Sequence, residues 1–174
     1  MYIYLKSILL VFFFCLCQPL FSQKDDSKDL ITVDLRIVAQ GASHNFKDTK
    51  SGYFAIATIT NSQDTTINFW IMNCSWPRDN WVTSNSIVYF ESPGCDNNSV
   101  IRVELLPHKK IDFYGVLQGS DKKLSNNKVR LGFLYFSKFK DLFNPLGRDE
   151  LKQVKKYWSN EVQLEDTLFT YRQD

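Results

Sequence analysis

Two cysteines and two tryptophans lie close together in the middle of the chain, where they could form a covalent bridge and a contact surface. Cys74 and Cys95 both follow the N-terminal segment that holds the other two cysteines. A disulfide between them would close a loop of about 22 residues and contribute about 3 kcal/mol, because it restricts the unfolded chain. A reactive thiol would instead need a neighbouring base or positive pocket, and no histidine is near in sequence. The pair therefore predicts a Cys74–Cys95 disulfide.

Trp76 and Trp81 fall inside the predicted disulfide loop, with Arg78 between them. If the two indole rings are exposed, they could stack on sugar rings or anchor a protein partner. If they are buried, they form a small core over one end of the domain, which is the commoner use of aromatic side chains in a small protein. The candidate binding surface consists of Trp76, Arg78, Trp81, Asp96 and Asn97.

Other kinds of site lack the residues that they need. A serine hydrolase would need a positioned histidine and a nucleophile elbow, whereas the chain has only His44 and His108 and no such motif. The same shortage argues against a zinc site. Asp96 and Asn97 lack the spacing and the closing glutamate of a calcium loop. The sequence therefore predicts no catalytic residue, no metal site and no cofactor.

The N-terminal residues have the order of parts that is typical of a secretory signal peptide. Lys6 is followed by an apolar run over 8–17 and then by the small residue Ser22. The run is about half as long as the roughly 20 apolar residues that a membrane-spanning helix needs. We predict a signal peptide over 1–22, cleaved after Ser22, and no transmembrane span in the mature chain. Cleavage after Cys17 is the alternative.

Lipidation at Cys15 or Cys17 is a further alternative. Such signals usually carry a small residue before the cysteine, whereas Phe14 and Leu16 precede these two. Export in any of these forms would place the chain in an oxidising compartment, which is the periplasm, the cell surface or the surrounding medium.

The mature chain of about 150 residues suits one domain. The formal net charge of the whole chain is only +2, which gives no electrostatic footprint for nucleic acid or for an anionic membrane surface. Residues 23–29 are polar and charged and predict a flexible leader. We assign the β domain to 30–164 and a C-terminal tail to 165–174.

Alternating and β-branched patterns predict seven or eight short strands. They cover residues 31–37, 53–60, 66–73, 87–90, 100–106, 111–117, 129–136 and 157–164. The short polar turn between the second and third strands predicts a hairpin. Leu151, Val154 and Trp158 lie at helical spacing, so we place one short helix before about Lys155. Strands without alternating helices predict an all-β, two-layer antiparallel sandwich.

The run from Phe69 to Trp76, together with Trp81, the stretch 94–98 and the stretch 104–107, resembles a group of small, uncharacterised secreted proteins of Gram-negative bacteria. Residues 157–160 are similar as well. The resemblance covers 30–164 and implies an immunoglobulin-like sandwich and export, but no activity. The arrangement around 106–113 is also loosely similar to bacterial proteinase-inhibitor sandwiches.

Three functions remain open at this point. The first is an exported, non-enzymatic binding module for a protein or glycan, with its contact surface within 76–98. The second is an enzyme whose carboxylates or histidine converge in a deep cleft. The third is a proteinase inhibitor that presents Ser75 to Gly94 as a rigid loop. We favour the first.

Overall fold

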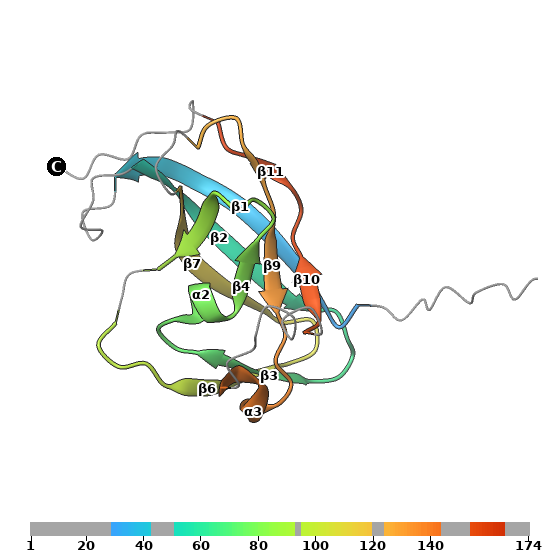
Figure 1. Cartoon of the computed structure of the whole chain (residues 1–174). Helices are drawn as coiled ribbons and strands as arrows, with labels where there is room; N and C mark the ends of the chain where they lie inside the picture. The colour runs from blue at the N-terminus through green and yellow to red at the C-terminus, as the bar shows by residue number, and fades with distance from the viewer. Residues whose placement is uncertain (1–28, 43–50, 93–94, 120–123, 144–153, 166–174) are drawn as a thin grey trace, which may run out of the picture.

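The computed structural model describes residues 29–42, 51–92, 95–119, 124–143 and 154–165. The predicted signal peptide, Cys15, Cys17 and His44 lie outside these residues, as do most of the predicted leader and tail. Figure 1 shows the elements, which are β1 (Ile31–Ala42), β2 (Ser51–Asn61), β3 (Ile67–Met72), α2 (Trp76–Asp79), β4 (Trp81–Thr83), β5 (Val88–Glu91), β6 (Val100–Leu105), β7 (Lys110–Gly119), β8 (Lys128–Val129), β9 (Leu131–Leu134), α3 (Phe139–Phe143), β10 (Lys156–Trp158) and β11 (Val162–Gln163).

The protein is all-β and antiparallel, and two sheets enclose most of its core. The first sheet has the strand order β1-β2-β7-β5, and the second has the order β10-β9-β4. Trp81 of β4 lies between them, with its ring centroid 5.5 Å from that of Phe113 in β7 and 5.2 Å from that of Phe133 in β9. Aromatic side chains at this spacing bury large apolar areas, so they hold the two sheets together.

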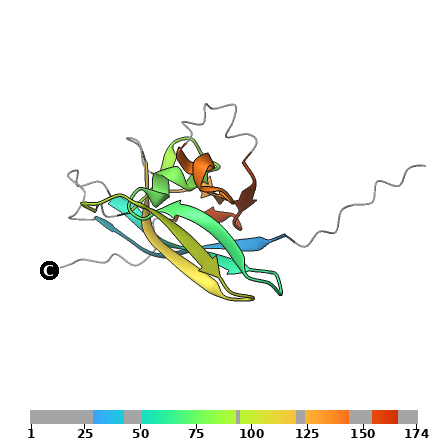
Figure 2. The same cartoon turned by 90° about the horizontal axis from the view of Figure 1, so that it is seen from below.

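The predicted strands are present, but their number and one of their pairings differ. The described residues form eleven strands rather than seven or eight, because the strand predicted over 129–136 is split into β8 and β9, the strand predicted over 157–164 is split into β10 and β11, and β4 was not predicted. The predicted hairpin of 53–60 with 66–73 is wrong, since β2 pairs with β1 and β7, and β3 pairs with β6. Both edges of β2 are occupied, by β1 and β7, so β3 cannot pair with β2 and lies outside the first sheet. Figure 2 shows β3 beside β6.

The helix predicted before Lys155 falls largely on 144–153, outside the described residues, so it stays a prediction. A short α3 lies earlier in the chain, and the expected last strand over 157–164 is split into β10 and β11. The stretch from Ser75 to Ser86, which reads as a loop in the sequence, contains α2 and β4.

The split between β10 and β11 is a β-bulge that places a side chain against the first sheet. Trp158 pairs with Gly132 and Val162 pairs with Val129, so three residues on one strand face two on the other. Asn160 lies in the bulge. Its amide nitrogen donates to the carbonyl oxygen of Leu35 at 3.0 Å, and its amide oxygen accepts from the N–H of Leu35 at 2.7 Å. The side chain of Asn160 thus bonds to both backbone groups of Leu35, as the backbone of a neighbouring strand would.

Asn80 has a comparable role on the opposite side of the molecule, where β3 passes the start of β4. Asn80 is fully buried. Its side chain accepts from the N–H of Met72 at 3.2 Å and donates to the carbonyl oxygen of Trp70 at 3.2 Å. Its own carbonyl oxygen accepts from the N–H of Leu134 at 2.8 Å. One residue therefore satisfies buried backbone groups of both β3 and β9.

Replacing Asn80 by alanine should strongly destabilise the protein. The substitution leaves the N–H of Met72 and the carbonyl of Trp70 without their partner, and each such buried group costs about 1–3 kcal/mol. We expect the free energy of unfolding to fall by about 3 kcal/mol in urea denaturation. The exposed Asn97→Ala variant is the control and should change it by less than about 0.5 kcal/mol. Equal effects of the two substitutions would contradict the assigned role of Asn80.

Candidate functional site

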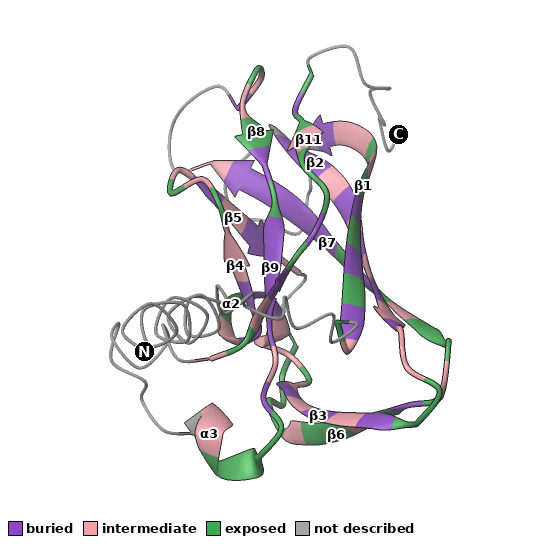
Figure 3. Ribbon diagram, turned by 90° about the vertical axis from the view of Figure 1, so that its right-hand side faces the viewer, coloured by how far each residue is buried: buried purple, intermediate pink, exposed green. Residues whose placement is uncertain are grey.

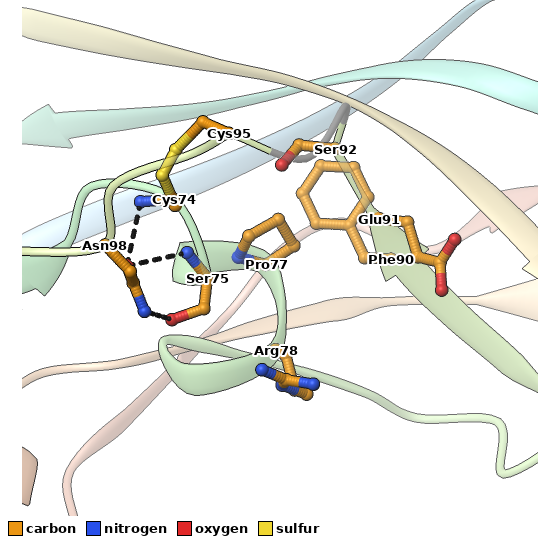
Figure 4. A pocket seen from close by; sticks show the side chains of 9 residues that line it. All are labelled: Cys74, Ser75, Pro77, Arg78, Phe90, Glu91, Ser92, Cys95 and Asn98. Carbon is orange, nitrogen blue, oxygen red and sulfur yellow. Dashed lines mark hydrogen bonds between the residues drawn. A yellow bond between two sulfur atoms is a disulfide. The ribbon is translucent and has the colours of Figure 1, made fainter. Parts of the chain in front are cut away.

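A hollow of about 400 Å³ adjoins the Cys74–Cys95 disulfide. We call it the disulfide groove, and its lining consists of Cys74, Ser75, Pro77, Arg78, Phe90, Glu91, Ser92, Cys95 and Asn98. Figure 4 shows Pro77 and the Phe90 ring between the disulfide and the carboxylate of Glu91. The groove therefore has an apolar middle with polar groups around it, which is the usual composition of a ligand site.

A second hollow, of about 540 Å³, continues on the other side of Arg78. We call it the seam hollow, because its lining comes mainly from β4 and β5, the edge strands of the two sheets. It is lined by Pro77, Arg78, Trp81, Val82, Thr83, Tyr89, Phe90 and Glu91. Four residues line both hollows, namely Pro77, Arg78, Phe90 and Glu91. The two hollows are therefore adjoining parts of one surface.

The predicted disulfide between Cys74 and Cys95 is present, with 5.6 Å between the two Cα atoms. It lies just beyond the last pair of the β3–β6 ladder, Met72 with Val100. The bridge closes the part of the chain that contains α2, β4 and β5, which supply the whole lining of the seam hollow and the part of the groove lining that the two hollows share. It therefore ties the groove to the end of the β3–β6 pair.

Asn98 fixes the start of α2 against the disulfide. Its amide oxygen accepts from the N–H groups of Cys74 and Ser75, each at 3.2 Å, and its amide nitrogen donates to the Ser75 hydroxyl at 2.7 Å. The Ser75 hydroxyl in turn donates to the Asp79 carboxylate. Pro77 suits the first turn of α2, where a missing N–H costs nothing. These bonds hold Pro77 at the wall of the groove (Figure 4).

Phe90 lines the groove and packs against the aromatic side chains of the core. The ring of Trp76 is half-buried, with its centroid 5.4 Å from that of Phe90 and 5.0 Å from that of Phe113. A Cβ atom at Gly115 would approach the Phe90 ring to 2.5 Å, so only glycine leaves room for this ring on β7. The position of Phe90 therefore depends on a neighbour far away in sequence.

Charges of both signs surround the shared part of the two hollows. The Arg78 side chain is 85% exposed, and its Nε lies 3.9 Å from the carboxylate of Asp79. Glu91 lines both hollows from β5. Arg78 is only weakly held by Asp79 at this distance, because a solvent-exposed pair gains little. Its guanidinium is available to an anionic group of a ligand.

The predicted surface residues are only partly brought together. Arg78 lines both hollows, and the Trp76 ring packs against the Phe90 ring. Trp81 lines the seam hollow, but it is only 3% exposed and its ring packs against Phe133, so it is chiefly a core residue. Asp96 and Asn97 are exposed next to the disulfide but belong to neither lining.

Several residues of the site could not be singled out in the sequence. Phe90 and Glu91 belong to a strand that looks ordinary in the sequence, and they reach α2 only through the fold. Asn98 stands in an Asx-rich turn, which was a usable signal, because such side chains often bond to nearby backbone groups.

The groups with shifted pKa values lie outside both hollows. Burial raises the pKa values of Tyr135 and Tyr157. The neighbouring Tyr157 hydroxyl raises the pKa of Lys155, and a hydrogen bond to Glu161 raises that of Lys128. Shifted groups tend to mark catalytic sites when they line a cleft. Here the shifted groups and the hollows occupy different places.

Histidine and metal chemistry find no support in the described part of the chain. His108 contacts Asp64 at 2.9 Å in an exposed pair, away from both hollows. Within the described ranges, no group of three or more His, Cys, Asp or Glu side chains could hold a metal ion. Within the described residues, the stretch from Ser75 to Ser92, part of the loop that the inhibitor alternative uses, contains α2, β4 and β5, with a turn over 84–87 between the two strands.

The fold and the groove together define a small, disulfide-bonded all-β domain with a surface hollow at the junction of its sheets. No protein-family model, curated protein or solved structure matches the chain. The immunoglobulin-like classification and the resemblance to secreted proteins of Gram-negative bacteria therefore stay predictions. Among the residues that the structure describes, no helix is long and apolar enough to cross a membrane.

Loss of the disulfide should lower the stability by the amount expected for its loop. In the Cys74→Ser/Cys95→Ser double variant we expect the free energy of unfolding to fall by about 3 kcal/mol, because the unfolded chain regains freedom. Urea denaturation of the oxidised wild type and of the double variant measures the difference. An unchanged transition midpoint would show that the bridge constrains nothing in the unfolded chain.

Proposed function

We propose that this chain is an exported, non-enzymatic binding module that holds an extended segment of a partner protein in the disulfide groove and the seam hollow. The observation that carries the proposal is the sharing of Pro77, Arg78, Phe90 and Glu91 by the two hollows. A shared wall makes a surface long enough for several residues of a ligand. Its apolar middle and its side chains of both charges suit a polypeptide with mixed side chains.

The backbone of β5 favours a protein ligand over a glycan. The N–H of Val88 donates to the carbonyl oxygen of Asn85 at 3.1 Å, and its carbonyl accepts from the Thr83 hydroxyl at 2.6 Å, so both groups face β4 rather than β7. Alternate residues of a strand direct their backbone groups to the same side. Phe90 therefore also directs its N–H and C=O toward β4, where an extended peptide could pair with them.

Export is supported by two independent features. The N-terminal residues have the composition of a signal peptide. The Cys74–Cys95 disulfide is the kind of bond that persists in an oxidising compartment and is rare in the cytosol. We place the mature chain in the periplasm, on the cell surface or in the medium.

The binding proposal is tested by selecting a phage-displayed library of random peptides on the immobilised mature protein, with a glycan array in parallel. Selected peptides should bind the wild type, and the Arg78→Glu and Glu91→Lys variants should weaken binding at least about tenfold, or about 1.4 kcal/mol. Fluorescence titration measures the affinity.

The matched control is Arg36→Glu, an exposed charge reversal on β1 that should leave the affinity unchanged. If neither groove substitution changes the affinity of the selected peptides, the peptides contact another part of the protein. If glycans on the array bind and no peptide is selected, the ligand is a glycan and not a protein.

The export proposal predicts the covalent state of the protein in the cells that make it. Intact-mass spectrometry after alkylation of free thiols should find a chain that begins at Gln23, with Cys74 and Cys95 unalkylated, because the signal is removed and the bridge is formed. A chain that retains Met1, or one with two alkylated thiols, would contradict export. A lipid-sized mass addition at Cys17 would favour the lipoprotein alternative.

A further inference from the structure

Among the residues that the structure describes, the β3–β6 pair has one covered edge and one open edge. On the β3 side, the N–H of Trp70 donates to the carbonyl oxygen of Phe136 at 2.9 Å, and the Tyr135 hydroxyl donates to the carbonyl oxygen of Asn68 at 2.8 Å. On the β6 side, the sheet order ends. Figure 3 shows β6 along the lower border of the molecule, outside β3.

The backbone direction of each β6 residue follows from the register. Trp70 directs its N–H away from β6, so its neighbours in β3, Phe69 and Ile71, face β6. Their partners in the ladder are Val103 and Ile101. The intervening residues of β6 therefore direct their N–H and C=O groups to the open edge. These residues are Val100, Arg102 and Glu104.

The open edge lacks several of the features that protect natural sheet edges. Edge strands are usually blunted by charged side chains, above all lysine, by proline, by a bulge or by a covering element, because unpaired backbone groups invite another strand. β6 has six residues without proline or lysine, and its register with β3 is continuous. Ile101 is 41% exposed. The side chains of Arg102 and Glu104 are 51% and 62% exposed.

We propose that β6 pairs antiparallel with β6 of a second copy of this chain, across a two-fold axis at Val103. This register places Arg102 opposite the partner's Glu104, and the reverse pair follows by symmetry. A register with the axis at Arg102 would place this residue opposite its own copy, and like charges directly opposite are destabilising. Because Arg102 and Glu104 lie on either side of Val103, the axis at Val103 places opposite charges face to face. The charges therefore favour this register.

The charges already lie in the arrangement that the dimer needs. Within one chain, the guanidinium of Arg102 lies 3.5 Å from the carboxylate of Glu104. Two copies would join these two pairs into a ring of four alternating charges. With the axis at Val103, residues 101–105 of the two copies face each other. Such a short ladder is a small interface, so the dimer is weak and its population rises with concentration. The surface is separate from both hollows and does not depend on the proposed ligand.

Charge reversal tests the pairing and its register. Sedimentation equilibrium of the mature wild type from about 1 µM to about 1 mM should show a monomer–dimer equilibrium. Arg102→Glu and Glu104→Arg, made separately, should each weaken the dimer at least tenfold, because each puts like charges opposite one another. An equimolar mixture of the two single variants, and the Arg102→Glu/Glu104→Arg double variant, should both recover the dimer.

Hydrogen exchange supplies a second measurement that does not require substitution. The amides of Arg102 and Glu104 should become protected as the concentration rises, whereas the amide of Val103, which already faces β3, should show no such dependence. A wild type that stays monomeric over the whole range would overturn the proposal and leave the edge to a foreign strand. A dimer that survives both single reversals would overturn it as well, because it would use another surface.

Discussion

The architecture depends on satisfying the backbone of β3 along the edge that faces away from β6. The N–H and C=O groups of such an edge cannot be buried without partners. Asn80 supplies these partners with one side chain, while its own carbonyl receives the N–H of Leu134. The same contact fixes where α2 ends and β4 begins, so the position of the groove follows from it.

The two sheets approach each other along both of their long sides, and side chains replace the missing ladder there. Asn160 pairs with Leu35 at the side of β1 and β10, and the Thr83 hydroxyl reaches Val88 at the side of β4 and β5. On the side of β4 and β5, the Thr83–Val88 bond closes only one end of the gap between the two sheets. The seam hollow lies where this side opens toward Pro77 and Arg78, so the candidate site occupies the incomplete part of the enclosure.

The sequence predicts those features that depend on local patterns. The alternation over 31–37 identifies β1, and the two cysteines in the middle of the chain identify the disulfide. The partner of β3 could not be predicted, because it depends on β2 already having neighbours on both edges. Arg78 was identified through its place between two tryptophans. Phe90 and Glu91 were missed, because only the long-range packing on Gly115 brings them to α2.

The bond between Asn160 and Leu35 also has a consequence for the order in which the chain can mature. The two residues are 125 positions apart, so the edge of β1 emerges from the ribosome or a translocon long before its cover exists. Contacts of such sequence separation form slowly. During this interval β1 offers a bare strand edge to any other extended chain. The edge of β1 is therefore among the last parts of the backbone to be covered as the chain folds.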